Sequence, residues 1–252
     1  MKMKDKVVII TGGGKGIGRG VAEAFAEEGA NLVITGRHQE ALNQAKAELE
    51  EEFHNQVLAL QADGSIEEDV KKVIQKTVEK FGHIDVLINN AMASRSGMML
   101  TEHKKEDFEL AIQTGLYAVY FYMREAHPYL KESHGAVINF ASGAGFSGRI
   151  GQSSYVAAKE GIRGLSRVAA TEWGSDGINV NIICPLVETQ QMLKWKEEHP
   201  DHYAKTIQGI PLGRFGDAKK DVGRTCVFLA SEDASFMSGE TVVLQGGSGL
   251  RP

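Results

Sequence analysis

The segment Val7-Val-Ile-Ile-Thr-Gly-Gly-Gly-Lys-Gly-Ile-Gly18 joins a short apolar run to a glycine-rich loop. An apolar run of this length, ended by glycines, is typical of a strand buried on both faces of a parallel sheet. Beyond it, Val21, Ala24 and Phe25 continue the apolar pattern with helical spacing. The segment therefore predicts a strand, a tight turn and a helix. In that setting glycine lets the backbone approach a pyrophosphate, and the start of the helix supplies free N–H groups to bind it.

The rest of the chain repeats this alternation of short buried strands and helices. Further strands are predicted at 31–35, 57–61, 83–90, 136–141, 177–183 and 240–244, with helices at 39–53, 70–81, 104–131, 153–174, 189–208 and 218–230. Since parallel strands need crossover connections, the pattern predicts an α/β fold, with a doubly wound parallel sheet of about seven strands and helices on both faces. We expect residues 1–252 to form a single domain. Ligands of such sheets bind beyond the carboxyl ends of the strands.

The composition excludes several classes of function. The 252 residues contain 33 acidic and 28 basic side chains, for a net charge of −5, which argues against nucleic acid or an anionic membrane as partner. No apolar run approaches the ~18 residues of a membrane span, and the start shows no signal-peptide pattern. Cys184 and Cys226 are too few for a disulfide framework and are expected to be inert and buried. The histidines lack metal-ligand spacing, so we expect no metal, and we predict a cytoplasmic protein.

Tyr155 and Lys159 lie four residues apart at the start of the predicted helix 153–174, so they share one helix face. A phenol of reference pKa ~10 is a poor base at neutral pH. A neighbouring ammonium favours the phenolate, which can then exchange a proton with a carbonyl or alcohol oxygen. Ser142 follows the predicted strand 136–141 and can hydrogen-bond the same oxygen. We therefore predict that these three residues are catalytic.

Together with these residues, the spacing Thr11-Gly-x3-Gly-x-Gly18 resembles the classical short-chain dehydrogenase/reductase family, and the resemblance extends over residues 6–247. It implies a Rossmann-type fold. It also implies an enzyme that interconverts a secondary alcohol and a ketone by hydride transfer with a nicotinamide cofactor. Lys159 is also expected to bind the nicotinamide ribose.

The end of the second predicted strand indicates the type of cofactor. The sequence there is Thr35-Gly-Arg-His38, whereas an NAD enzyme carries an acidic residue that binds the ribose diol. Arg37 can instead pair with a 2′-phosphate through its planar guanidinium, and Lys15 is a second cation in reach. The sequence therefore favours NADP(H). The cofactor-binding residues that the motifs and the resemblance imply are Gly12, Gly14, Lys15, Gly16, Ile17, Gly18, Arg37, His38, Asp63, Gly64, Asn90, Ala91, Tyr155, Lys159, Pro185 and Thr189.

Three positions depart from the family pattern. Met92 stands where the family usually has glycine, and Leu186 replaces the glycine of the usual Pro-Gly after the sixth strand. Gly115, in the predicted helix 104–131, stands where the family has an asparagine that completes the catalytic set. That asparagine bends the helix, so that a backbone carbonyl holds a water linked to the lysine. Because glycine also permits a bend, our hypothesis is that the bend and the water persist without the side chain.

Substrate specificity is expected to lie in residues 92–100, 143–152 and 186–215, and the last segment is predicted to form a lid. These segments are apolar and rich in methionine, which suits a bulky apolar substrate. The predicted substrate-binding residues are Met92, Ser142, Gln152, Tyr155, Leu186 and Met192. By resemblance, the substrate is predicted to be a hydroxysteroid. The alternative is a 3-oxoacyl group on acyl-carrier protein or coenzyme A, although an acidic carrier would select a basic patch that is not evident beside the site.

A second class of function is a non-catalytic NADP-binding sensor or scaffold. The replaced asparagine at position 115 favours it, whereas intact Ser142, Tyr155 and Lys159 argue against it. The family resemblance also implies a homotetramer. The predicted helices 104–131 and 153–174 are expected to pack across a subunit interface, and the first of them carries Tyr117, Tyr120, Phe121, Tyr122 and Met123.

Overall fold

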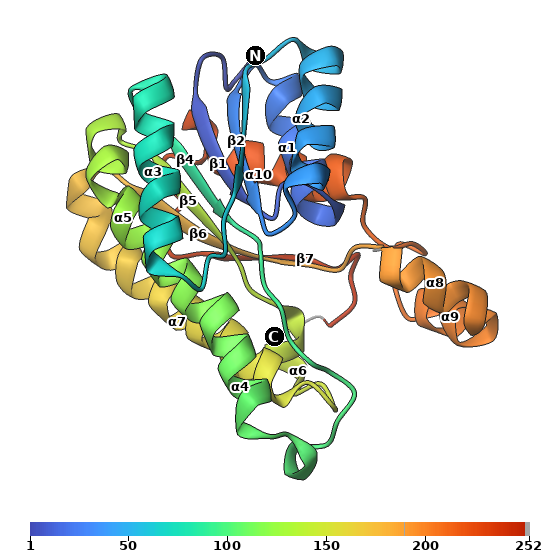
Figure 1. The fold of residues 1–252 in the computed structure, drawn as a ribbon. Coiled ribbons are helices and arrows are strands. Elements are labelled where there is room, and N and C mark those ends of the chain that lie inside the picture. Colours follow the sequence, from blue (N-terminus) through green and yellow to red (C-terminus); the bar gives the residue numbers. More distant parts are fainter. Residues whose placement is uncertain (189, 250–252) are drawn as a thin grey trace.

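The sheet decides the arrangement of the whole molecule. In the computed structural model, which describes residues 1–188 and 190–249, seven parallel strands follow the order β3-β2-β1-β4-β5-β6-β7 (Figure 1). They are β1 Val7–Thr11, β2 Asn31–Gly36, β3 Val57–Gln61, β4 Val86–Asn89, β5 Ala136–Phe140, β6 Asn179–Pro185 and β7 Thr241–Leu244. The order reverses between β1 and β4, which is where doubly wound sheets bind their ligands. The predicted doubly wound α/β fold is confirmed.

Helices cover both faces of this sheet (Figure 1). One face carries α1 Gly16–Glu27, α2 Gln39–Phe53 and α10 Arg224–Leu229, and the other carries α3 Glu67–Phe81, α5 Ala118–Ser133 and α7 Ser153–Trp173. The shorter helices are α4 Lys105–Ala111, α6 Gly143–Ser147, α8 Gln190–Glu198 and α9 Pro200–Gln208. Single 3-10 turns lie at Leu100–Glu102, Gly174–Asp176 and Glu232–Ala234.

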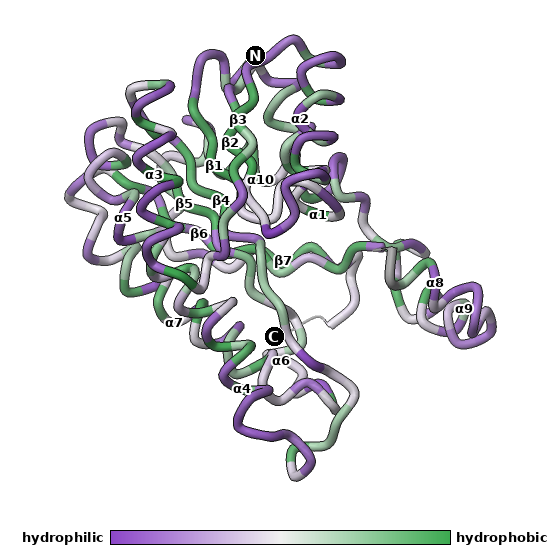
Figure 2. Tube along the Cα trace, in the orientation of Figure 1, coloured by the Kyte–Doolittle hydropathy of each residue, from purple (hydrophilic) through white to green (hydrophobic). Residues whose placement is uncertain are grey.

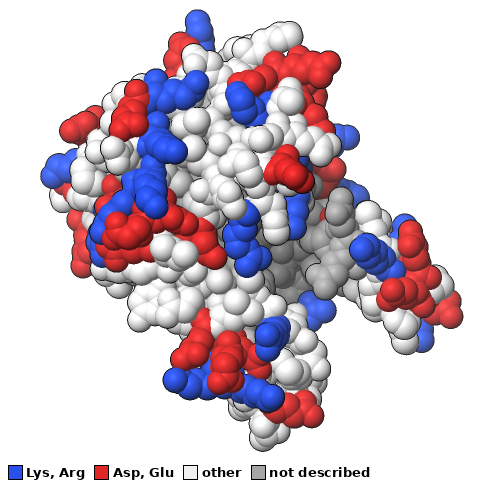
Figure 3. Space-filling view, viewed as in Figure 1, with Lys and Arg blue, Asp and Glu red and all other residues white. Residues whose placement is uncertain are grey.

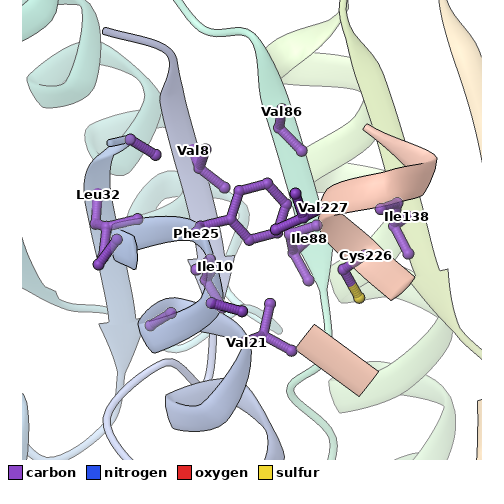
Figure 4. Close-up of a cluster of buried hydrophobic side chains, with 14 of the residues drawn as sticks. Val8, Ile10, Val21, Phe25, Leu32, Val86, Ile88, Ile138, Cys226 and Val227 are labelled. Carbon is purple, nitrogen blue, oxygen red and sulfur yellow. The ribbon is translucent and has the colours of Figure 1, made fainter. Parts of the chain in front are cut away.

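The two faces of β1 supply the two halves of the core. Val8 and Ile10 pack with α1, α2 and α10, and Figure 4 shows them around Phe25. Val7 and Ile9 point to the opposite face and pack with residues of α3, α5 and α7. Burial on both faces explains why the strand is a continuous apolar run. In Figure 2 the hydrophobic stretches accordingly follow the strands, and hydrophilic stretches lie on the outer helices and loops.

The predicted long helix 104–131 is present as an unbroken run of helical residues from Lys105 to Ser133, but its hydrogen bonding changes near the middle. α4 passes into a wide π-helical turn at Ile112–Tyr117, and α5 begins after it. Gly115 lies within this turn. The irregularity is therefore retained at the position where a bend was hypothesised. A π turn is set by a shift in backbone hydrogen bonding, which the spacing of apolar side chains does not record.

The predicted helix 189–208 is divided. α8 ends at Glu198 and α9 starts at Pro200, because proline has no N–H to donate and fits only the first turn of a helix. The two helices project from the sheet (Figure 1) and share a small apolar cluster that includes Tyr203 and Phe215. The predicted helix 218–230 likewise begins with a π turn, at Ala218–Gly223, before α10.

Cys184 and Cys226 are free thiols and both are buried. Across the described ranges, no helix combines the length and the apolar character that a membrane span requires. Within the same residues, His, Cys, Asp and Glu side chains do not gather in groups of three that could hold a metal ion.

A chain of buried side-chain hydrogen bonds connects the central strands to α7. Asn89 Nδ2, at the end of β4, donates to Asn139 Oδ1 on β5 at 2.8 Å. Asn139 Nδ2 donates to Ser166 Oγ on α7 at 2.8 Å, and Ser166 Oγ donates to the Ile162 carbonyl oxygen at 2.6 Å. Because a buried polar group needs a partner, this chain favours a single register of α7 against β4 and β5.

Asn139→Ala is expected to lower the free energy of unfolding by about 1–3 kcal/mol, because it removes the buried partner of Asn89 and Ser166. Urea denaturation followed by circular dichroism measures the change. The control Gln75→Ala removes an exposed hydrogen bond to Glu79 and should change the free energy of unfolding by less than about 0.5 kcal/mol. Equally small effects of the two substitutions would contradict the structural role of Asn139.

Candidate active site

The loop after β1 presents its backbone, rather than side chains, to a cleft. Gly12 and Gly16 have φ angles of +71° and +56°, which favour glycine. A Cβ on Gly18 would lie 2.3 Å from the Gly12 carbonyl oxygen, and one on Gly12 would lie 2.9 Å from Asn90 Nδ2. α1 starts here with no side-chain cap from Lys15 and no acidic residue in its first turn. The N–H groups at the start of the helix are therefore available to a phosphate.

Hydrogen bonds join this loop to the loop after β4. Thr11 Oγ1 accepts from the backbone N–H groups of Asn90 and Ala91, each at 3.0 Å. Asn90 Nδ2 donates in turn to the Thr11 carbonyl oxygen at 2.9 Å. After β3, the Asp63 carboxylate accepts from the N–H and the hydroxyl of Ser65, in a turn that holds Asp63 at the cleft. Loops from three strands thus border the same cleft.

A cavity of about 680 Å³ opens at this edge of the sheet. Its walls include most of the residues predicted to bind the cofactor: Gly12, Lys15, Gly16, Ile17, Arg37, His38, Asp63, Gly64, Asn90 and Ala91, together with Met92. The volume lies in the usual range for a cofactor site. With bare glycine backbone and a free helix start on one wall, the residues fit a dinucleotide whose phosphates face α1.

The remaining predicted cofactor residues lie in other places. Gly14 packs toward α2, where a Cβ would lie 3.2 Å from Leu42 Cδ2, and Gly18 supports the loop from behind Gly12. Pro185 is the last residue of β6. Thr189 lies outside the described residues.

Positive charge lies at the mouth of the cavity although the chain is acidic overall. Lys15 and Arg37 line the cavity, and neither pairs with a carboxylate of residues 1–188 or 190–249. Figure 3 shows Lys and Arg side chains around the hollow between the sheet and the α8–α9 helices. Both cations are therefore free to bind an anionic ligand.

Ser142 and Tyr155 meet beyond the end of β5. Ser142 precedes α6, and its Oγ accepts from the Ala144 N–H at 3.1 Å. Tyr155 lies in the first turn of α7 and shares a hydrogen bond with Ser142. Burial raises the pKa of the Tyr155 hydroxyl, and the bond with Ser142 acts in the opposite direction. Burial thus favours the neutral phenol, and a nearby positive charge is needed to favour the phenolate.

The positive charge of Arg149 acts against the burial that raises the pKa of Tyr155, and Lys159 places a second cation near the phenol from the next turn of α7. Its side chain is buried, with its Nζ 5.8 Å from the centre of the Tyr155 ring. The Nζ donates to the Phe140 carbonyl oxygen at 2.5 Å. Burial disfavours the ammonium and lowers the pKa of Lys159 to about 8. The three residues predicted to be catalytic are therefore brought together, with a buried cation beside the phenol.

Two of the departures from the family pattern meet in space. A Cβ on Gly115 would lie 3.1 Å from Sδ, 3.2 Å from Cε and 3.3 Å from Cγ of Met92. Met92 itself lines the cavity. The thioether therefore fills the space that a side chain at position 115 would enter, so the two departures are coupled in packing.

The other residues predicted to bind substrate lie in two places. Gln152 precedes α7, and its Oε1 is buried with no hydrogen-bond partner in the part of the chain that the structure describes. Leu186 and Met192 instead pack against the apolar cluster of α8 and α9 that includes Tyr203. These two side chains therefore contribute to the small core of the projecting segment.

Arg163 is a charged residue near this site that the sequence analysis missed. It follows Tyr155 and Lys159 at the same spacing of four residues on α7, and it is only 2% exposed. The spacing alone could have indicated that Arg163 lies near the site, since residues at i, i+4 and i+8 follow one face of a helix.

Comparisons with known proteins agree with this geometry. A family model described as Enoyl-(Acyl carrier protein) reductase matches residues 12–248. The chain is 57% identical, over 253 aligned positions and 98% of each chain, to the 12alpha-hydroxysteroid dehydrogenase of a Clostridium species. It is 34% identical to the 3-oxoacyl-[acyl-carrier-protein] reductase FabG of Chlamydia muridarum, over 96% of this chain and 97% of that one. The crystal structure of levodione reductase is similar, with a TM-score of 0.91 and 34% identity over 97% of this chain and 98% of that chain.

A glycine loop at the switch point of the sheet, with a tyrosine and a lysine beside it, defines an oxidoreductase of alcohols and ketones that uses a nicotinamide cofactor. The chain belongs to the short-chain dehydrogenase/reductase family, as the resemblance predicted.

Gly115→Asn is expected to lower the free energy of unfolding by about 1–3 kcal/mol, because the new side chain competes with Met92 for space. Met92→Gly alone leaves a void beside Gly115. The double variant is expected to be more stable, by about 1 kcal/mol or more, than the sum of the two single effects. Urea denaturation of the four proteins measures this coupling.

Gly164→Asn is the matched control, since a Cβ built on Gly164 has no atom within 4 Å apart from its chain neighbours and the nearby backbone of its own helix. It should show no coupling to Met92→Gly. Strictly additive effects of the substitutions at positions 92 and 115 would show that the two positions are independent.

Proposed function

We propose that the protein interconverts a secondary alcohol and a ketone on a bulky, apolar hydroxysteroid, with NADP(H) as cofactor. The observation that carries the proposal is the hydrogen-bonded pair of Ser142 and Tyr155, with Lys159 behind it, next to the dinucleotide cleft. The 57% identity to a 12alpha-hydroxysteroid dehydrogenase, against 34% to a 3-oxoacyl-[acyl-carrier-protein] reductase, supports the steroid class.

In this proposal the side chains move and hold a proton. Tyr155 donates its hydroxyl proton to the carbonyl oxygen during reduction and takes it back during alcohol oxidation. Ser142 hydrogen-bonds the same oxygen, and the Lys159 ammonium stabilises the phenolate, against the burial that raises the pKa of Tyr155. When bound, the nicotinamide supplies or accepts the hydride.

Arg37 and Lys15 are proposed to select NADP(H). Arg37 follows β2 at the point where an acidic residue would bind the ribose diol of NAD, and its planar guanidinium suits a 2′-phosphate. Lys15 stands at the start of α1 on the same cavity, and neither cation is neutralised by a carboxylate in the described ranges.

The substrate is proposed to bind between Met92, Gln152 and a lid formed by residues 186–215, within one domain that spans the chain. Met92 offers a flexible apolar surface to a bulky ring system. The buried and unpartnered Oε1 of Gln152 is an acceptor for a hydroxyl group on the substrate.

The protein is further proposed to act as a cytoplasmic homotetramer. Tyr117 and Tyr120 are exposed and are suited to contact another subunit. Tyr122 and Met123 were predicted to join them, but they are buried in the core between α5 and the sheet, so that part of the prediction is wrong.

The wild-type protein is expected to oxidise NADPH in the presence of a 12-keto steroid, followed by the absorbance of the reduced nicotinamide. Tyr155→Phe is expected to lower kcat by at least about 100-fold, because it keeps the ring and removes the proton donor. Tyr129→Phe, on α5, is the matched control. If the protein reduces an acetoacetyl thioester and no steroid, the proposed substrate class is wrong and the substrate is an acyl thioester. If it binds NADPH but reduces no ketone, the result favours a non-catalytic sensor.

Arg37→Asp is expected to lower kcat/KM with NADPH by about 10- to 100-fold and to raise it with NADH, because it removes a charge-assisted hydrogen bond to the 2′-phosphate and adds a ribose acceptor. Lys76→Asp makes the same change of charge on an exposed position of α3 and should alter neither value. An unchanged NADPH-to-NADH ratio in Arg37→Asp would reject the role of Arg37.

A further inference from the structure

Arg163 is buried where a charge is costly. It lies on α7, one turn beyond Lys159 and two turns beyond Tyr155, and only 2% of it is exposed. Arginine is rarely buried to this extent without partners, because its guanidinium must leave water. It is not among the residues that line the dinucleotide cavity, so cofactor binding does not explain it.

The guanidinium contacts both ends of α6, the five-residue helix that begins directly after Ser142. Arg163 Nη2 donates to the Ser142 carbonyl oxygen at 3.1 Å. The guanidinium carbon lies 3.7 Å from the centre of the Phe146 ring. A helix of five residues that includes two glycines has little stability of its own. The position of α6, and of Ser142 before it, therefore depends on contacts from outside.

Glu160 fixes the orientation of the guanidinium. Its carboxylate accepts from Arg163 Nη2 at 2.8 Å and from Arg163 Nε at 3.1 Å. The carboxylate also lies directly against α6, since a Cβ on Gly145 would be 1.9 Å from Glu160 Oε1. Gly145 thus leaves room for the carboxylate, and the bidentate ion pair sets the direction in which Nη2 points.

We infer that Arg163 is a positioning residue that aims Ser142 at Tyr155 by holding the Ser142 carbonyl oxygen. The inference rests on the proposed function, because the direction of the Ser142 hydroxyl matters when a substrate oxygen binds between the two residues. If the backbone at Ser142 shifts, its hydroxyl shifts with it. A misplacement of about 1 Å in an active site can lower the rate by about 100-fold.

Arg163→Met retains much of the side-chain volume and removes the charge. Its kcat for ketone reduction is expected to fall at least about tenfold, while the KM for NADPH changes less than about twofold. Arg167→Met, at an exposed position one turn further along α7, is the matched control and should keep the wild-type kcat. Arg163→Lys keeps the charge without the planar guanidinium and should give a kcat between that of Arg163→Met and that of the wild type. If Arg163→Met does not fold, the kcat of Arg163→Lys tests the role of Arg163 instead.

A Ser142→Ala background separates positioning from general packing. If Arg163 acts through Ser142, the Arg163 substitution lowers kcat less than about twofold further in that background. The same fold-loss with and without Ser142→Ala overturns the inference. A wild-type kcat in both Arg163 variants overturns it as well.

A crystal structure of either Arg163 variant tests the inference without turnover. The Ser142 carbonyl is expected to shift and the hydrogen bond between Ser142 and Tyr155 to be lost, whereas an unchanged Ser142 overturns the inference. If the wild-type protein reduces no ketone, the proposed function is refuted. The crystal structure of an Arg163 variant then still tests whether Arg163 positions Ser142.

Discussion

The register of α7 against β5 is the constraint on which the site depends. β5 delivers Ser142 from its carboxyl end, and α7 delivers Tyr155 and Lys159 from its first turns, so the two elements must meet at one relative position. The buried hydrogen bond from Asn139 to Ser166 sets that position from within the core. A slip of one residue along α7 would turn each side chain by about 100° about the helix axis and direct it away from β5. The catalytic geometry is therefore determined in the core, more than two helical turns from Tyr155.

The departures from the family pattern follow from backbone geometry in the same way. Gly115 lies in a π turn, and the turn is a property of the backbone, so it does not need an asparagine side chain. The space that such a side chain would fill is taken by Met92, which also lines the cavity. One change in packing thus places a flexible, apolar side chain where the family has a polar one. This is consistent with a bulky apolar substrate, because methionine adapts its shape to irregular surfaces.

Much of the fold and part of the site could be predicted from local sequence patterns. The strands could be predicted because each is a short apolar run, and the Tyr155–Lys159 pair because residues four apart share a helix face. The inward direction of Tyr122 could not be predicted, because consecutive residues such as Tyr120 to Met123 point to different sides of a helix and only the tertiary fold shows which side faces the sheet. Arg163 was missed because an arginine on an amphipathic helix is usually a surface residue. Two of its partners, Ser142 and Phe146, come from a separate segment and are brought to it only by the tertiary fold.

The two cations on the buried face of α7, Arg163 and Lys159, have different partners and different roles. Arg163 is paired with Glu160, so its positive charge is largely neutralised. Lys159 donates to a neutral carbonyl oxygen and keeps its charge at neutral pH, since its pKa is lowered only to about 8. Burial meanwhile raises the pKa of Tyr155, so the phenol stays protonated at the same pH. At neutral pH the site therefore holds a protonated phenol, a hydroxyl and the buried Lys159 ammonium, and the charge of Arg149 also acts on Tyr155. Each of these favours negative charge on a ketone oxygen, so the resting protonation state suits reduction, and alcohol oxidation first requires the proton of Tyr155 to leave.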